Sequence, residues 1–378
     1  MAELHRLQAD QLKLNDALPW DVLDSGGTLL LRKGYVVRTD EQLEELLERG
    51  MYVDAATFRA HQASQPRAAV YDPMYLMEAV QARLAWLLEA KPRDGSLVTE
   101  LQALAKQIMS FAEKSPDLAI AAMQLLEHRN YPIAHSFHVA VLAEMLGRRA
   151  EWTVERRETM ICAALTMNIS MIDLQLTLRN QRDALTAEQR KAVNEHPMES
   201  VKHLMQCRVD NDEWLRAVLE HHETPDGKGY PRKVSNPSEK AMLIGACDNF
   251  AAKLSPRAYR KPIIGSEATR ITFVKQGQDK ANPFPAMLVK EVGIYPPGTL
   301  VKLANGEIGV VSKRGATFKT PIVTSLINTK GLPFLEPVLR STQEPAYGIA
   351  SVLPLDKALV GLNFEQIWCG KKRSVAMA

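Results

Sequence analysis

The spacing of apolar residues divides the chain into three segments. In the longest, from Pro73 to about Leu288, apolar residues recur every three to four positions, as on one face of an α-helix. The clearest stripes are Met77, Val80, Leu84 and Leu87, then Leu101, Leu104, Ile108 and Phe111, and then Val139, Leu142 and Leu146. Typical helix lengths predict roughly seven to nine helices in this segment.

The segment before it has the pattern of short strands separated by turns. We expect strands at 12–17, 21–23, 28–32 and 35–37, with turns at Ser25-Gly26-Gly27 and at Gly34. One helix is expected to begin near Thr39. The sequence therefore predicts a small β-rich module over residues 1–60, followed by a linker over residues 61–72.

After Gly298 the apolar spacing again becomes that of strands. Leu300–Leu303 and 308–311 flank Asn305-Gly306, which predicts a hairpin with a type I′ turn. Another strand is expected over 321–327, followed by a turn at Lys330-Gly331. The predicted fold is mainly α, with a helical domain over residues 73–295, the β-rich N-terminal module and a short C-terminal β extension over residues 296–378.

Composition and charge narrow the classes of function. The 378 residues carry a formal net charge of +3, which gives no reason to expect a nucleic-acid partner. The first residues lack the apolar core of a signal peptide, and no run of about 18 apolar residues predicts a membrane span. The four cysteines are scattered, without a metal-binding or redox spacing. We therefore expect a cytoplasmic protein.

The densest run of chemically active residues is His221-His222-Glu223-Thr224-Pro225-Asp226-Gly227-Lys228-Gly229-Tyr230-Pro231. It combines two imidazoles and a carboxylate with a glycine-rich turn. His135, His196 and Asp248 lie elsewhere in the helical segment. Taken one at a time, such histidines are more often structural, but four imidazoles and one carboxylate are enough to fill one transition-metal coordination sphere.

These residues resemble the HD-GYP family over roughly residues 75–295. Its HHExxDGxGYP motif is matched at each specified position from His221 to Pro231. The resemblance is supported by the His-Ser helix start at His135, the His-Pro pair at His196 and the segment that follows Asp248. It implies an all-helical HD-domain bundle.

The resemblance also implies an activity and its residues. Active members hydrolyse cyclic di-GMP with a binuclear or trinuclear iron or manganese centre. The metal ligands carried over by position are His135, His196, His221, His222 and Asp248. Phosphate contacts would fall on Arg257 and Arg260, within a basic loop that is equally well read as a solvated surface. The loop bearing Gly227, Gly229, Tyr230 and Pro231 is a candidate contact surface for diguanylate cyclase domains, or simply a turn.

The chain departs from the family at the His-Asp pair. The HDxGK segment aligns with Met167, Asn168 and Met171 in place of the histidine, the aspartate and the lysine. A carboxylate found in some members four residues before the first histidine is Tyr131 here. A neutral amide is a poor bridge between hard divalent cations, and a thioether suits softer metals.

The sequence therefore predicts no binuclear centre, and at most one iron- or manganese-type ion held by His196, His221 and His222. We expect a signalling protein with impaired catalysis that acts by binding cyclic di-GMP or a partner protein. Two alternatives stay open. One is an active phosphodiesterase with a reduced metal site, and the other is a scaffold for a diguanylate cyclase or another signalling protein.

Overall fold

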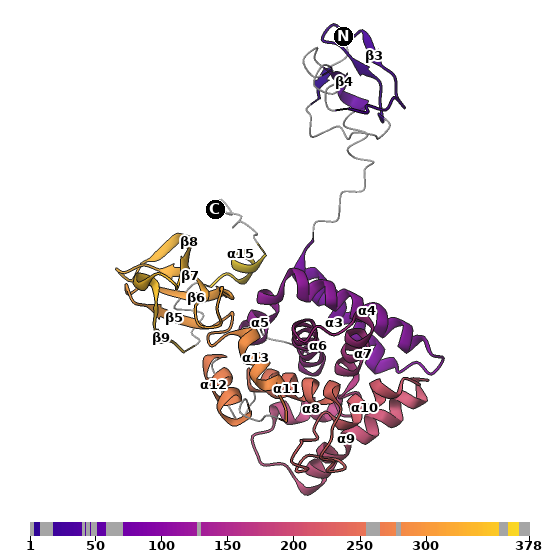
Figure 1. The fold of residues 1–378 in the computed structure, drawn as a ribbon, viewed down its shortest axis with the longest axis vertical. Helices are drawn as coiled ribbons and strands as arrows, with labels where there is room; N and C mark the ends of the chain where they lie inside the picture. Colours follow the sequence, from indigo (N-terminus) through magenta and orange to yellow (C-terminus); the bar gives the residue numbers. More distant parts are fainter. Residues whose placement is uncertain are drawn as a thin grey trace. The chain divides into compact units, whose positions relative to one another are not determined.

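The structure, a computed structural model, describes residues 4–7, 18–39, 42, 46, 51–57, 71–126, 130–254, 265–276, 281–354 and 362–369. The chain forms two compact units, Met1–Tyr71 and Asp72–Ala378. The second unit is mainly helical and ends in an antiparallel sheet (Figure 1). Much of the expected linker lies outside the described residues, as does the strand expected at 12–17.

The N-terminal unit is a four-stranded sheet in the order β1-β4-β2-β3. Its strands are β1 (Leu4–Arg6), β2 (Val22–Leu23), β3 (Leu29–Leu31) and β4 (Tyr52–Asp54). The glycine turn between β2 and β3 is present, and Asp24 accepts hydrogen bonds there from Gly26 and Thr28. The strand expected at 35–37 is wrong, because only Val36 makes an isolated bridge after the Gly34 turn. Of the helix expected after Thr39, only Gln42 and Leu46 are described, and both are helical.

The helical segment contains more helices than the spacing predicts. Eleven lie among the described residues between Pro73 and Val292: α3 (Pro73–Ala90), α4 (Ser96–Lys114), α5 (Pro116–Leu125), α6 (Tyr131–Arg149), α7 (Val154–Thr166), α8 (Ile172–Asn180), α9 (Ala187–Gln206), α10 (Asp212–Glu220), α11 (Glu239–Leu254), α12 (Gly265–Gln276) and α13 (Phe284–Val292). The estimate of seven to nine was too low because several of these helices have only nine or ten residues.

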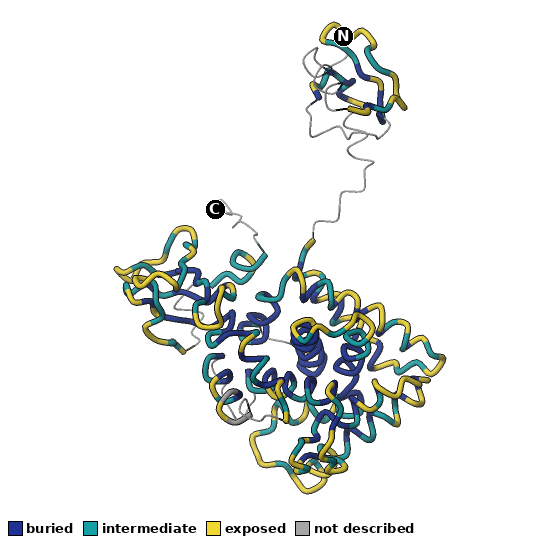
Figure 2. Tube along the Cα trace, viewed as in Figure 1, coloured by how far each residue is buried: buried dark blue, intermediate teal, exposed yellow. Residues whose placement is uncertain are grey.

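Helix α6 lies at the centre of the bundle. Its residues from Tyr131 to Gly147 are all buried, and α3, α4, α5, α7, α8, α11 and α13 contact it. Figure 2 shows buried residues along most of α6, and the second half of α7, from Met160 to Thr166, is buried as well. The apolar stripes predicted from the sequence are in this core, including Leu84, Phe111 and Leu142. Burial of such side chains is the main favourable contribution to folding.

Short polar side chains fix where the helices around the centre begin. Thr153 and Asn211 accept hydrogen bonds from the backbone at the start of α7 and α10. Thr186 and Gln189 form a reciprocal capping box at the start of α9. These caps satisfy backbone N–H groups that have no partner within a helix, so they set the ends of the helices that carry the candidate site.

The chain continues into a five-stranded antiparallel sheet in the order β8-β7-β6-β5-β9. Its strands are β5 (Leu300–Leu303), β6 (Ile308–Lys313), β7 (Ile322–Ile327), β8 (Pro333–Ser341) and β9 (Ile349–Val352), with a short helix, α15 (Phe364–Trp368), after them. The predicted hairpin is present, with Leu300 opposite Val310. The type I′ turn is wrong, because only Gly306 has a positive φ, of 95°. A tight turn followed by a glycine in the left-handed region explains this geometry.

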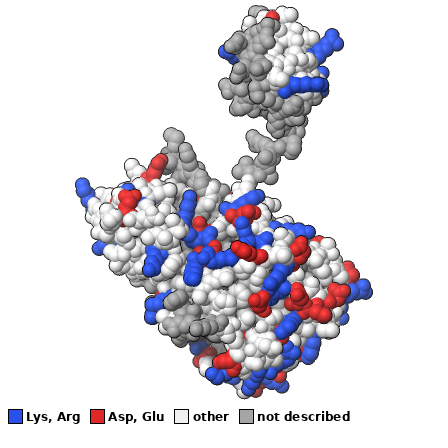
Figure 3. Space-filling view, viewed as in Figure 1, with Lys and Arg blue, Asp and Glu red and all other residues white. Residues whose placement is uncertain are grey.

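Arg314 joins this sheet to the helices. Its Nε lies 2.7 Å from Asp117 Oδ1, and its guanidinium also pairs with Glu291. Gln124 adds a hydrogen bond from Nε2 to the Pro297 carbonyl, 2.7 Å long. On the face that Figure 3 shows, positive and negative side chains are interspersed over the helices, in agreement with the small net charge. No described helix is long and apolar enough to cross a membrane.

Candidate functional site

Three helices and the loop that follows a fourth carry the residues selected from the sequence. His135 lies in the first turns of α6, His196 in the middle of α9 and Asp248 in α11. His221 directly follows α10, and His222 begins the next loop. Residues up to 113 positions apart in the sequence thus reach one region, although the run from His221 to Pro231 is the only continuous signal among them.

Three of the five proposed ligands form one cluster. Each of His196, His221 and His222 offers one ring nitrogen, and these three nitrogens lie within 4.8 Å of one another. His196 and His221 are buried, and His222 is partly buried and stacks on Tyr230 with ring centroids 4.5 Å apart. This triad is the one group of three or more possible metal ligands found among the described residues.

Backbone carbonyls orient two of these imidazoles. The Nδ1–H of His196 donates to the Val193 carbonyl at 2.7 Å, and the Nδ1–H of His221 donates to the Val218 carbonyl at 2.7 Å. Pro197 explains the first bond, because a proline has no N–H to occupy the carbonyl four residues before it. The local sequence His196-Pro197 therefore fixes the tautomer of the histidine that precedes the proline.

The opposite nitrogens of these rings face each other. His196 Nε2 and His221 Nε2 are 3.3 Å apart, and since both rings carry their proton on Nδ1, each Nε2 presents a lone pair. Two lone pairs at this distance repel each other unless a cation lies between them. Two imidazole nitrogens about 2.1 Å from one ion would be separated by a similar distance. The donor set therefore fits a single divalent metal.

The electrostatic setting keeps the triad in its neutral, ligating form. Burial, with a smaller contribution from the neighbouring His221, lowers the pKa of His196 to about 3. Burial is also the main reason why the pKa values of His221 and His222 are lowered. The Asp248 carboxylate opposes this effect at all three histidines, and it is the negative charge that would balance a bound cation.

These lowered pKa values predict that the metal-free protein loses stability in mild acid. Unfolded histidine takes up a proton near pH 6.5 and folded His196 near pH 3, so between these values the unfolded state binds more protons. For His196 alone the free energy of unfolding should be roughly 2 kcal/mol lower at pH 5 than at pH 7. Urea unfolding with chelator at both pH values measures this difference. The difference should be smaller in His196→Gln, and an equal difference would contradict the prediction.

The other two proposed ligands are paired with each other. His135 Nε2 lies 2.7 Å from Asp248 Oδ1, and this hydrogen bond contributes to lowering the pKa of the Asp248 carboxyl despite its burial. The ionised carboxylate accepts, so the Nε2–H of His135 donates. His135 and Asp248 therefore form a hydrogen-bonded pair beside the triad and do not join its cluster of nitrogens.

The positions that the sequence resemblance aligns with the HDxGK segment lie at the junction of α7 and α8. Met167 is fully buried within the main apolar cluster, whereas Asn168 and Met171 line a cavity. The turn that carries them is held by Ser170, whose Oγ–H donates to the His196 carbonyl at 2.9 Å and lies 2.9 Å from Ser200 Oγ. The turn is therefore firmly attached to α9, and it presents the amide of Asn168 and the thioether of Met171 to the cavity.

The carboxylate of the motif holds the loop that follows the histidines. Buried Glu223 accepts hydrogen bonds from the backbone N–H groups of Arg232, Lys233 and Val234, at 2.6, 3.0 and 3.1 Å. Asp226 accepts from Thr224 Oγ1 and the Lys228 N–H, which lower its pKa to about 2. Glu223 and Asp226 thus shape the loop.

The residues proposed for partner contacts differ in their accessibility. Gly229 is buried and packs so closely that a Cβ there would lie 2.4 Å from the His222 carbonyl oxygen. Tyr230 stacks on His222, and Gly227 has φ 68° in the turn. Pro231 is partly buried. The exposed side chains of the loop are those of Thr224, Asp226 and Lys228, so these would meet a partner first.

Gly245 brings α11 close to the triad. A Cβ at this position would lie 2.4 Å from the His221 carbonyl oxygen. We expect Gly245→Ala to push α11 away from His221, to lower the free energy of unfolding by about 1–3 kcal/mol and to weaken metal binding. Gly348→Ala is the control, since its Cβ would meet no atom nearer than 3.5 Å. Equal stability and metal affinity in the two variants would contradict the expectation.

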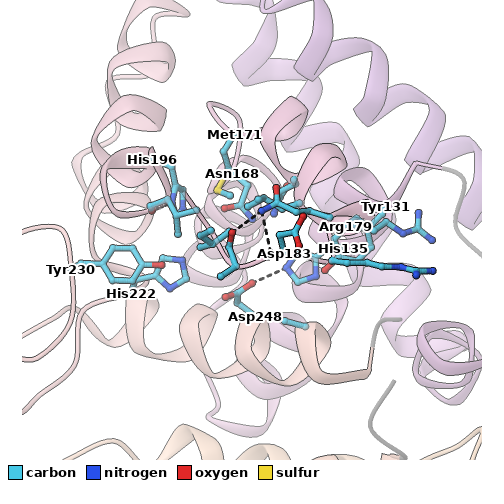
Figure 4. A pocket seen from close by; sticks show the side chains of 18 residues that line it. Tyr131, His135, Asn168, Met171, Arg179, Asp183, His196, His222, Tyr230 and Asp248 are labelled. Atoms are coloured by element: carbon cyan, nitrogen blue, oxygen red, sulfur yellow. Dashed lines mark hydrogen bonds and ion pairs between the residues drawn. The ribbon is translucent and has the colours of Figure 1, made fainter. Parts of the chain in front are cut away.

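A cavity of about 450 Å³ opens beside the triad (Figure 4). Figure 4 shows His196, His222 and Tyr230 on one side of it and Tyr131 and Arg179 on the other, with Asp248 and His135 between them. Asn168, Met171, Gln175, Arg182 and Asp183 also line it. The cavity thus combines the candidate metal ligands with two arginines.

Those arginines are cavity residues that sequence reasoning missed. Arg179 and Arg182 follow Met171 and Gln175 at helical spacing, so one face of α8 and the loop after it points toward the cavity. That spacing was the available signal, but no motif contains it. Arg257 and Arg260, which the resemblance selects instead, lie outside the described residues.

Known proteins similar to this chain agree with the fold and the site region. Residues 99–281 match the family model described as HD domain. The chain is 30% identical over 223 residues to the cyclic di-GMP phosphodiesterase PA4108 of Pseudomonas aeruginosa, covering 58% of this chain and 54% of that protein. It is 25% identical over 185 residues to the cyclic di-GMP phosphodiesterase PdeB of Borreliella burgdorferi, covering 48% of each. The chain therefore spans about half the length of these curated relatives.

Among solved structures, the chain is similar to Bd1817, a HDG"Y"P protein from Bdellovibrio bacteriovorus, with 14% identity and a TM-score of 0.49. That match covers 75% of this chain and 97% of the other. The residues matched by the HD-domain model include all three histidines of the cluster. The chain contains an HD domain related to those of the HD-GYP cyclic di-GMP phosphodiesterases.

Proposed function

We propose that this chain is a signalling protein that binds cyclic di-GMP at a site with one divalent metal and has lost most or all of the hydrolytic activity named for its relatives. The observation that carries the proposal is the contrast between the two halves of the site. His196 and His221 face each other with Nε2 atoms 3.3 Å apart, while the neighbouring half has Asn168 in place of a bridging carboxylate.

The charges of the site support one metal in preference to two. Among the described residues, Asp248 is the carboxylate whose charge acts on all three histidines, and it already accepts a hydrogen bond from His135. Two divalent ions beside it would leave a large uncompensated positive charge in a mostly buried site, which is costly. Asn168 contributes no charge, and Met167 lies in the apolar core.

Each remaining residue has a role that does not require turnover. A bound divalent ion supplies Lewis acidity toward a phosphodiester oxygen. His196, His221 and His222 would hold that ion, and Asp248 would balance its charge. Tyr230 fixes the ring of His222 by stacking, and Glu223 holds the loop that carries Tyr230. The site would thus bind an anionic nucleotide without the second ion that a two-metal hydrolysis needs.

Metal analysis and an activity assay test this proposal together. The protein is purified, loaded with Mn²⁺ or Fe²⁺, and analysed for metal per chain, for cyclic di-GMP binding by calorimetry and for linear product formation. We expect about one ion per chain, binding, and little or no product. About two ions per chain with linear product formation would overturn it in favour of an active phosphodiesterase. Metal without any cyclic di-GMP binding would overturn it in favour of a scaffold.

A further inference from the structure

A buried carboxylate stands directly before the two adjacent histidines, outside the run from His221 to Pro231. Glu220 is the last residue of α10, and its side chain is almost fully buried. It accepts hydrogen bonds from α10 itself, from the end of the loop that follows the histidines, and from the start of α11. These segments carry or adjoin His221, Tyr230 and Asp248, so one side chain connects three parts of the candidate site.

Two arginines hold the Glu220 carboxylate. The Nε–H of Arg216, one turn earlier in α10, donates to both carboxylate oxygens at 3.1 and 3.0 Å. Arg232, at the end of the loop, donates from Nη2 to Glu220 Oε1 at 2.9 Å. Hydrogen bonds between charged groups are stronger than those between neutral groups. The carboxylate therefore ties the end of the loop to the end of α10.

The other carboxylate oxygen reaches the start of α11. Glu220 Oε2 accepts a hydrogen bond from the Ser238 N–H at 2.8 Å. Ser238 directly precedes α11, and its Oγ accepts from the Ala241 N–H at 3.3 Å, as a helix cap does. The same helix brings Gly245 against the His221 carbonyl. Glu220 therefore helps to fix how α11 lies against His221.

We propose that Glu220 is a positioning residue for the metal triad, which it orients through its contacts with α10, the loop and α11. The metal part of the inference rests on the proposed function. His221 is held from two sides, since its Nδ1–H donates to Val218 in α10 and its carbonyl lies against Gly245 in α11. Glu220 joins these two helices. Without it, a small shift between them would move His221 Nε2 from its place 3.3 Å from His196 Nε2.

A second ion pair joins the same two helices and provides the matched control. Glu213 lies about two turns before Glu220 on α10, and its Oε2 lies 2.8 Å from Lys240 Nζ on α11. The Glu213 side chain is 71% exposed, whereas that of Glu220 is 4% exposed. Substituting Glu213 therefore removes a contact between α10 and α11 without changing the loop or the residue before His221.

Binding of Co²⁺ to the full chain tests the proposal. Imidazole sites bind Co²⁺ at least as tightly as Mn²⁺ or Fe²⁺, its visible absorption reports the geometry of its ligands, and competition with a fluorescent chelator gives its affinity. In Glu220→Gln we expect affinity about 10-fold to 100-fold weaker, the usual cost of replacing a residue that orients metal ligands, and a changed spectrum. Glu213→Gln should stay within about twofold of the wild type, because exposed ion pairs contribute little.

A merely structural role for Glu220 gives a different result. It would lower the melting temperature of Glu220→Gln and leave the Co²⁺ affinity and the spectrum of the folded protein unchanged. That result would overturn the proposal, and so would an equal loss of affinity in Glu220→Gln and Glu213→Gln.

Arg232→Gln tests the same contact from the loop side and keeps the proposal testable if Glu220→Gln does not fold. The Arg232 side chain is 46% exposed, so its replacement should leave the chain folded. We expect Co²⁺ affinity several-fold weaker than in the wild type. If both single variants fold, the double variant should lose little more affinity than Glu220→Gln, because both changes remove one contact. Wild-type affinity in Arg232→Gln, or additive losses in the double variant, would contradict the proposal.

A measurement without metal keeps this inference separate from the proposed function. NMR of the histidine side chains in chelator-treated protein detects imidazole N–H protons that are held in hydrogen bonds and exchange slowly. The Nδ1–H signal of His221 should be present in the wild type and in Glu213→Gln, and lost or shifted in Glu220→Gln. His196 is the internal reference, since its corresponding bond to the Val193 carbonyl lies within α9.

The two failures can then be told apart. If the wild type binds no Co²⁺, the proposed function fails, and the His221 signal decides on Glu220. A change confined to His221 would support the positioning role, whereas an unchanged His221 signal in Glu220→Gln would overturn it.

Discussion

Asn168→Asp is expected to raise the metal content of the Mn²⁺-loaded protein from about one to about two ions per chain, and to produce measurable hydrolysis of cyclic di-GMP. Asn168 is almost fully buried and lines the cavity together with His135 and Asp248. A carboxylate has two anionic oxygens that can bridge two hard cations, and an amide of nearly the same shape does not. Metal analysis and product formation measure the two effects.

Substitution of the neighbouring Met167 should change the metal content less than substitution of Asn168. Met167 is buried among apolar side chains and does not line the cavity, so Met167→His places an imidazole in the core at a cost of about 1–3 kcal/mol. We therefore expect Asn168→Asp to add more metal than Met167→His, and the double variant to exceed both once the imidazole turns toward His135. Asn194→Asp, exposed on α9, controls for added charge. The interpretation fails if metal content stays at about one ion in both Asn168→Asp and the double variant.

His196→Gln is expected to weaken binding of the single metal by at least about a hundredfold, more than the loss of an outer-shell partner usually costs. The Nε2 of His196 is one of the two nitrogens that lie 3.3 Å apart. The orientation of its ring depends on the Val193 carbonyl, which Pro197 leaves free. Competition with a fluorescent chelator measures the affinity.

His203→Gln is the control on the same helix, since His203 is near the end of α9 and outside the triad. Because the triad histidines are neutral when folded, the loss in His196→Gln should appear without a large fall in stability at pH 7. Equal metal affinity in His196→Gln and the wild type would mean that the metal binds elsewhere.

The helical core and the C-terminal hairpin were predictable because local pattern determines them. Leu84, Phe111 and Leu142 recur at helical spacing and are buried, and Asn305-Gly306 joins two strands whose register matches the alternation of apolar residues. The turn type was not predictable from these residues, because Asn-Gly is compatible with more than one turn geometry. A type I′ turn needs positive φ at both residues, whereas here only the glycine has it. Short helices were undercounted because nine residues show barely two turns of periodicity.

The candidate site was predictable where a motif contains its residues. His221 and His222 stand in a continuous motif, and the structure brings His196 to them. The sequence does not reveal that Met167 faces the core while Asn168 faces the cavity, since neighbouring residues in a turn can point to opposite sides. Nor does it reveal that Arg179 meets Tyr131, a contact between α8 and the start of α6 that depends on tertiary packing.

The three backbone bonds to Glu223 have a consequence for how such chains are classified. Glu223 accepts backbone hydrogen bonds from residues 232–234, so its side chain has a structural role that does not depend on which reaction the neighbouring histidines support. Under the proposed function, selecting proteins by the run from His221 to Pro231 alone would group working hydrolases with receptors that have lost turnover. Under the same proposal, the residues that discriminate between the two groups are 167–171, at least 50 positions upstream of that run, and they should be read first.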